Sequence, residues 1–156
     1  MGFEKSGPGG TFNQYGPRQS NEGKTGGVPS VGATKEAVVH LNGEYLASED
    51  KLGVAVIPAG SKILRWHLDV NEAFDLGGTN PTIDIGEDGD EATNGFSISE
   101  AQAEAEGVTT AETFNGTFVN ELDTDVTLGV ALGGTSPTVE DATVGEARVV
   151  IEYIRL

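Results

Sequence analysis

The sequence predicts an all-β protein: an antiparallel, jelly-roll-type β-sandwich with one short helix and an extended N-terminal arm. Apolar and polar side chains alternate with period two along several segments, most clearly at residues 64–70, 126–132 and 147–154. Turn residues separate these segments at irregular intervals, and the chain has no strand–helix–strand rhythm of the kind that builds a parallel sheet. The count of about eight strands fits a double-sheet jelly roll.

Length and composition set the limits of the prediction. The chain has 156 residues, enough for one domain with a real core, and it has no cysteine for disulfides or thiolate metal sites. No apolar run approaches the roughly 18 residues of a membrane span, and the N-terminus has no apolar signal core. The formal net charge of -16 disfavours nonspecific attraction to nucleic acid or to an anionic membrane. We therefore expect a soluble chain that binds neither.

The charge divides the chain into two parts. Residues 1–35 hold four basic and two acidic side chains, a net charge of +2, which leaves -18 for residues 36–156. Residues 1–33 are rich in Gly, Pro, Ser, Asn and Gln, and such a segment cannot bury enough apolar surface to offset the entropy lost on ordering. We therefore predict a flexible arm at 1–33 and a β-sandwich body at 34–156.

The arm carries candidate anchors for a partner. They are aromatic or guanidinium side chains spaced along the flexible segment: Phe3, Phe12, Tyr15 and Arg18. Aromatic and Arg side chains are enriched at the centres of protein interfaces, so these four are the predicted partner-binding residues. The alternative is a solvated tail whose aromatic residues are incidental.

Two hairpins are predicted at the start of the body. A short strand at 37–41 ends at Asn42-Gly43, a dipeptide typical of tight hairpin turns, and Tyr45-Leu46 starts the return strand. Residues 52–74 form the second hairpin, with its turn at 58–60 and with Val54, Val56 and Pro58 on one side of its first strand.

The long strand of the second hairpin is the predicted centre of the fold. Its inward residues are Leu64, Trp66, Leu68 and Val70, and Trp66 is the only Trp in the chain. A strand that continues to Phe74 would be about twice the usual length, so we expect a bulge or bend near Asn71-Glu72.

The middle of the chain holds the only convincing helix. Residues 76–80 are predicted as a loop, and residues 82–85 as a strand with Ile83 and Ile85 inward. Ser97 and Glu100 match a capping box ahead of a short helix at 101–105, and Gly107 stands where a helix C-terminus favours glycine. Residues 114–119 are predicted as a strand that Gly116 interrupts.

The last third returns to clear alternation. The predicted inward residues are Val126, Leu128, Val130 and Leu132, followed by a turn at 133–137. The closing strand at 147–154 is apolar on both faces, so we expect it at the centre of a sheet or against a neighbouring subunit.

The sequence gives no support for catalysis. His40 and His67 fall on strand faces opposite the apolar side, and neither a nucleophile elbow nor a glycine-rich phosphate-binding loop is present. Either histidine could pair with a carboxylate such as Asp69, but we interpret both as surface residues. We predict that the protein is not an enzyme.

The acidic loop at 86–95 is the candidate metal site. Asp84, Asp88 and Asp90 are oxygen ligands separated by short spacings and glycines, which suits Ca²⁺. The EF-hand pattern fails, because the twelfth position counted from Asp84 is Gly95. The alternative, a charged turn that stays solvated, is the one we favour, so no cofactor is expected.

The order of these features resembles small virion proteins of tailed bacteriophages. The similar segments are IPAG at 57–60, NEAFD at 71–75, PTIDIGEDGD at 81–90, NGF at 94–96 and GEARVVIEYI at 145–154. The resemblance covers residues 50–156. It implies a β-sandwich displayed on the particle: a head decoration (cement) protein that binds the major capsid protein at the capsid surface after assembly in the host cytoplasm.

The arm lies outside the pattern and favours a cement role, because a protein that clamps a lattice needs an extended peptide. The closing strand suggests a homo-oligomer, and the resemblance together with the three-fold sites of icosahedral lattices suggests a trimer. Two alternatives stay open. One is a phage tail or fibre-associated structural protein, and the other is a carbohydrate-binding β-sandwich, although aromatic residues make up only 6% of the chain.

Overall fold

The computed structural model describes residues 34–48 and 55–156, which form two four-stranded antiparallel sheets. The strands are β1 (Thr34–Asn42), β2 (Val56–Ile57), β3 (Ser61–Glu72), β4 (Leu76–Glu87), β5 (Gly95–Ser99), β6 (Gly107–Ala111), β7 (Val126–Val139) and β8 (Glu146–Arg155). The helices are α1 (Gly43–Ala47), α2 (Glu100–Ala103) and the 3₁₀ helix η1 (Gly116–Val119). Within these described segments, no helix combines the length and the hydropathy of a membrane span.

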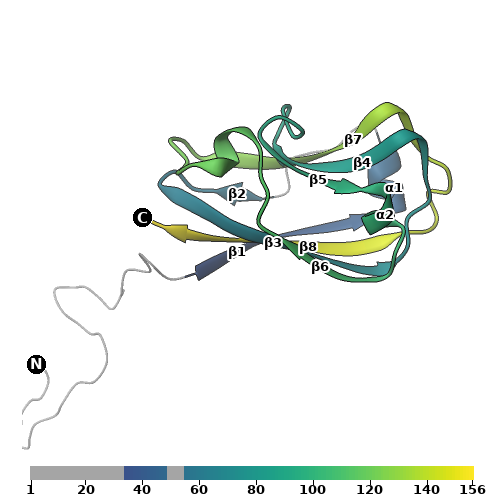
Figure 1. The fold of residues 1–156 in the computed structure, drawn as a ribbon, viewed down its shortest axis with the longest axis horizontal. Helices are drawn as coiled ribbons and strands as arrows, with labels where there is room; N and C mark the ends of the chain where they lie inside the picture. The colour runs from purple at the N-terminus through teal and green to yellow at the C-terminus, as the bar shows by residue number, and fades with distance from the viewer. Residues whose placement is uncertain (1–33, 49–54) are drawn as a thin grey trace, which may run out of the picture. The chain divides into compact units, whose positions relative to one another are not determined.

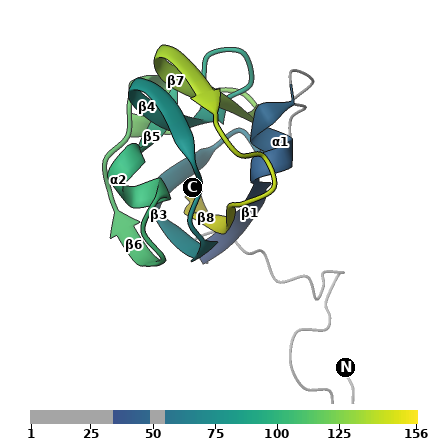
Figure 2. The same cartoon turned by 90° about the vertical axis from the view of Figure 1, so that its right-hand side faces the viewer.

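The strand order identifies the sandwich as a jelly roll. One sheet has the order β1-β8-β3-β6 and the other β2-β7-β4-β5. Figures 1 and 2 show β4, β5 and β7 in one layer and β1, β3, β6 and β8 in the other. The first strand pairs with the last, the second with the seventh, the third with the sixth and the fourth with the fifth. This nested pairing confirms the predicted fold class.

A stack of aromatic rings joins the two sheets. Trp66 on β3 lies 4.6 Å, centroid to centroid, from Phe96 on β5, with an angle of 10° between the ring planes. Phe114 packs edge-on against Phe96 at 6.0 Å and contacts Phe118 of η1 at 6.5 Å. The indole N–H of Trp66 donates to the Thr113 carbonyl oxygen at 3.3 Å, so the ring is buried without losing its hydrogen bond. The predicted place of Trp66 in the core is confirmed.

β3 contains two irregularities. A register shift between Ile63 and Arg65 makes Leu64 an extra residue, and Ile63 is buried where Leu64 is only half-buried. The predicted inward position of Leu64 is therefore wrong, because uninterrupted alternation cannot anticipate a bulge. The second shift, between Val70 and Glu72, confirms the bulge expected near Asn71-Glu72.

The predicted hairpin at 52–74 is wrong. β2 pairs with β7 and β3 pairs with β8 and β6, so Pro58-Ala59-Gly60 carries the chain from one sheet to the other. Ile57 is buried and Val56 is 54% exposed, so the side that carries Val56 faces outward. Val54 lies outside the described residues.

The predicted hairpin at Asn42-Gly43 is also wrong, since a short helix follows β1. Asn42 has an extended backbone with φ of −146°, and its side-chain oxygen caps α1 by accepting from the Tyr45 N–H at 2.7 Å. A Cβ on Gly43 would lie 2.2 Å from the Val144 carbonyl oxygen, so glycine allows the chain to pass close to the β7–β8 loop.

Two strands replace segments that the sequence assigned differently. Ser97 lies in β5, and the capping box forms two residues later, between Ser99 and Gln102 at the start of α2. Residues 107–111 form β6, whereas the predicted strand at 114–119 contains η1, whose Phe118 is buried. The expected number of strands is still eight. β5 and β6 were not predicted, and the strands predicted at 45–46 and 114–119 are absent, so the two kinds of error cancel.

The predicted loop at 76–80 and turn at 133–137 both lie inside strands. They belong to a nine-residue repeat, LGGTNPTID at 76–84 and LGGTSPTVE at 132–140, whose copies pair antiparallel with Thr79 opposite Thr135. Positive φ values recur at equivalent positions: +110° at Gly78, +105° at Gly134, +50° at Asn80 and +51° at Ser136. β4 and β7 therefore bend together under a local two-fold symmetry, at the end of the sandwich on the right of Figure 1.

The first prediction concerns the ring stack. Trp66→Ala removes the ring that contacts Phe96, and it should lower the free energy of unfolding by about 3–5 kcal/mol. Trp66→Phe keeps an aromatic ring but loses the N–H donor, so it should cost less. Urea denaturation of both variants measures the difference, and wild-type stability in Trp66→Ala would contradict the packing described.

The second prediction tests the paired bend. A Cβ on Gly78 would lie 2.6 Å from the Ser136 carbonyl oxygen, and one on Gly134 would lie 2.5 Å from that of Asn80. Each Gly→Ala change should cost at least about 2 kcal/mol in unfolding free energy, from backbone strain and steric overlap, and the two costs should be equal.

The matched control for this pair is Gly60→Ala. Gly60 also has a positive φ, +77°, but a Cβ there would have nothing within 4 Å, so only the strain remains. Its cost should be the smallest of the three. Clearly unequal costs for the two repeat positions would contradict the local symmetry.

Candidate interaction face

The predicted partner-binding residues belong to the arm. Phe3, Phe12, Tyr15 and Arg18 lie outside the described residues, as does the whole of 1–33. Their role stays a prediction.

The structure places the three candidate calcium ligands in different settings. Asp84 is buried on β4, where its Oδ1 accepts a hydrogen bond from the Thr82 hydroxyl at 2.9 Å. Asp88 and Asp90 are exposed in the turn after β4, and the Asp90 carbonyl accepts from the Asn94 N–H at 2.8 Å. Over residues 34–48 and 55–156, no three carboxylate or imidazole groups gather in a way that could hold a metal ion. The three aspartates are close in sequence, but Asp84 belongs to β4 while Asp88 and Asp90 belong to the turn that follows it.

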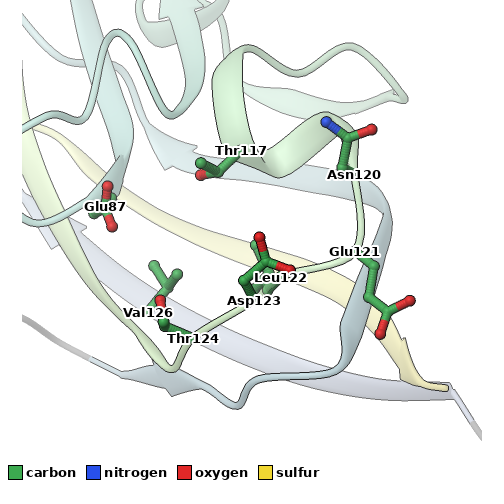
Figure 3. Close-up of a pocket in the computed structure, with 8 residues that line it drawn as sticks. All are labelled: Glu87, Thr117, Asn120, Glu121, Leu122, Asp123, Thr124 and Val126. Carbon is green, nitrogen blue, oxygen red and sulfur yellow. The ribbon is translucent and has the colours of Figure 1, made fainter.

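A shallow pocket of about 220 Å³ opens between η1 and the start of β7. Its lining combines carboxylates, an amide, hydroxyls and two aliphatic side chains: Glu87, Thr117, Asn120, Glu121, Leu122, Asp123, Thr124 and Val126. In Figure 3 the three carboxylates stand apart, and Glu121 points away from Glu87 and Asp123. The acidic groups of the pocket do not point toward a common position where they could bind one ion or ligand.

Two titratable groups have shifted pKa values. Burial raises the pKa of Tyr45 on α1, and the negative charge of Asp88 adds to the effect. Hydrogen bonds from the Thr143 hydroxyl and N–H, at 2.6 and 2.9 Å, lower the pKa of the exposed Asp141. Both shifts have local causes, and the two groups belong to different loops and elements.

Charge separates one sheet from the rest of the body. Every Lys and Arg in the described part of the chain lies on β1, β3 or β8: Lys35, Lys62, Arg65, Arg148 and Arg155. The same strands carry five acidic residues: Glu36, Asp69, Glu72, Glu146 and Glu152. The β1-β8-β3-β6 sheet therefore has no net formal charge, since β6 carries none. The other described residues hold sixteen acidic side chains and no basic ones.

We call the outward side of this sheet, together with the strand ends that carry Lys35 and Arg155, the neutral face. At its centre, Glu152 on β8 contacts Arg65 Nε at 3.6 Å and His67 Nε2 at 2.6 Å, both on β3. His67 Nδ1 lies 2.8 Å from the Thr110 hydroxyl on β6. This network joins three adjacent strands. His67 pairs with Glu152 and not with Asp69, while His40 is exposed on β1.

Aliphatic side chains surround this network. Val150 on the central strand β8 stands opposite Val38 on β1 and His67 on β3. Val38 is 36% and Val108 72% exposed, and Ile154 is half-buried. The predicted central position of the last strand is confirmed by its place between β1 and β3. The outward side chains of this strand, Val150 and Ile154, still contribute apolar surface to the neutral face.

No protein-family model matches the sequence, and no curated protein does. The fold does have counterparts. A chain in the acidic stable capsid structure of Helicobacter pylori bacteriophage KHP30 aligns with a TM-score of 0.51 and 10% identity, over 80% of this chain and 89% of that one. A chain in the capsid of Ralstonia phage GP4 aligns with a TM-score of 0.53 and 20% identity, over 83% and 89%. At these identities the likeness is one of fold. The jelly roll described here is therefore a fold also found in two phage capsid structures, in agreement with the resemblance to virion proteins.

Proposed function

We propose that this protein is a structural component of a phage particle, a decoration (cement) protein that binds the head and stabilises its lattice. The observation that carries the proposal is the similarity of its jelly roll to chains in two phage capsid structures, over four fifths of its length. The order of sequence motifs supports the same assignment independently of the fold.

Several features support a structural role over a catalytic or sugar-binding one. His67 bonds to Glu152 and Thr110 and links three strands, and the carboxylates of the acidic pocket do not converge. Sugar-binding modules use exposed aromatic platforms. Among the residues that the structure describes, every Trp, Tyr and Phe side chain is buried or half-buried.

The partner on this proposal is the major capsid protein, with the arm as an extended docking segment. The body is a homo-oligomer, a trimer at three-fold sites of the lattice, with its acidic loops directed to solvent. Both capsid matches favour a head location over a tail or fibre location.

The third prediction tests the arm. Replacing Phe12, Tyr15 and Arg18 together by Ser should abolish co-sedimentation with heads of the phage that encodes the chain, because it removes the anchoring side chains. The melting temperature should stay unchanged. The control replaces Asn13, Gln14 and Gln19 by Ser and should bind normally. Normal binding by the first variant would contradict the role of the arm, and failure of the unmodified chain to bind heads would contradict the proposed function.

The fourth prediction concerns self-association. Sedimentation equilibrium of the purified chain should show a trimer whose stability is unchanged or increased by added salt, since salt screens repulsion between acidic bodies. Dissociation by salt would indicate an interface held by opposite charges. A single isolated copy at each binding position on the particle would contradict the trimer.

A further inference from the structure

We propose that the neutral face is the surface with which the body lies on the capsid. The inference rests on the proposed function and adds to it the surface that makes the contact. The occupant is a capsid protein surface of mixed charge and aliphatic character, and not a basic patch that would attract the acidic loops.

The first argument is the distribution of charge. Outside β1, β3 and β8, the described residues carry sixteen acidic side chains and no compensating base. A partner that covered those surfaces would have to strip water from carboxylates and supply a positive charge for each. The outward positions of the sheet hold three basic side chains among five acidic ones, and Lys35 and Arg155 add two more bases at the strand ends. This face can therefore be covered at a lower electrostatic cost than the purely acidic surfaces.

The second argument is that ionic groups at the centre of the face already have partners. Glu152 holds both Arg65 and His67, and His67 also reaches Thr110. A protein placed over this network covers charges that already lie close to an opposite charge, while the Arg65 Nε is left as a buried donor without a hydrogen bond.

The third argument is apolar surface in the right place. Val38 lies on the edge strand β1, Val108 on the edge strand β6, and Val150 and Ile154 on the inner strand β8, all at outward positions among the charged side chains. Aliphatic area framed by polar groups is the usual composition of a protein interface.

The fourth argument is connectivity. The chain ahead of the described body is 33 residues long and joins it at Thr34, the first residue of β1. A fully extended segment of that length spans at most roughly 110 Å. The arm continues from β1, an edge strand of the sheet that forms the neutral face. If the body contacts the capsid through this face, the arm and the body can bind the same lattice, and the binding of each raises the effective concentration of the other.

The test adds a negative charge at exposed positions of either sheet. Val38→Glu with Val108→Glu alters the neutral face, and Ser97→Glu with Thr127→Glu is the matched control at exposed positions of β5 and β7. All four positions are at least partly exposed, and circular dichroism with a melting curve checks that each full-length variant folds. Binding to purified heads is then measured by co-sedimentation, and self-association by sedimentation equilibrium.

The neutral-face variant should bind heads at least roughly tenfold more weakly, because it places unpaired charges in the interface. The control should change binding less than about twofold, and wild-type binding should not weaken between low and high salt, since no opposite charges hold the interface. Wild-type-like binding by the neutral-face variant overturns the inference and leaves the proposed function intact. Loss of self-association with head binding retained assigns the face to a second copy and also overturns it. No binding by the unmodified chain overturns both proposals.

Discussion

The fold depends on a bulge of one residue in β3. Alternation along a strand would place Ile63 and Trp66 on opposite sides, yet both are buried, because the register shift between Ile63 and Arg65 inserts Leu64 as an extra residue. The bulge brings Ile63 into the core while Trp66 faces Phe96 of the other sheet and Arg65 and His67 face outward to Glu152. One strand can therefore contribute both to the contact between the sheets and to the ionic network of the neutral face along its whole length.

The two sheets differ in what they present to the outside. The β2-β7-β4-β5 sheet carries the nine-residue repeat, whose paired bends use Gly78 and Gly134 where any side chain would meet backbone, and acidic loops surround it. The β1-β8-β3-β6 sheet holds every described base, so the basic side chains that offset carboxylates are confined to one sheet of the body. An acidic protein that must attach to a large assembly needs one surface that can lose its water at low cost. On our account, the confinement of all the described basic residues to one sheet provides that surface.

The fold class could be predicted from the sequence because alternation marks buried strands wherever it is unbroken, as at Val126 to Val130 and Ala147 to Tyr153. The pairing of the strands could not be predicted, because a turn sequence such as Pro58-Ala59-Gly60 is compatible both with a hairpin and with a crossing between sheets. Asn42 illustrates a second limit, since its side chain serves a helix cap as well as a turn. The repeat at 76–84 and 132–140 is visible in the sequence and indicates two segments with the same backbone conformation, yet the prediction treated them as a loop and a turn. The neutral face depends on which strands become neighbours, so residue order alone does not disclose it.

Direct imaging of purified phage particles at a resolution that separates β-strands tests the central claim most directly. Our account predicts eight-stranded sandwiches on the outside of the head, at three-fold positions, with the β1-β8-β3-β6 sheet against the capsid protein and the acidic loops toward solvent. Sandwiches found only on the tail, or particles that lack them, would contradict the proposed function. Sandwiches on the head with the β2-β7-β4-β5 sheet against the lattice would contradict the assignment of the neutral face.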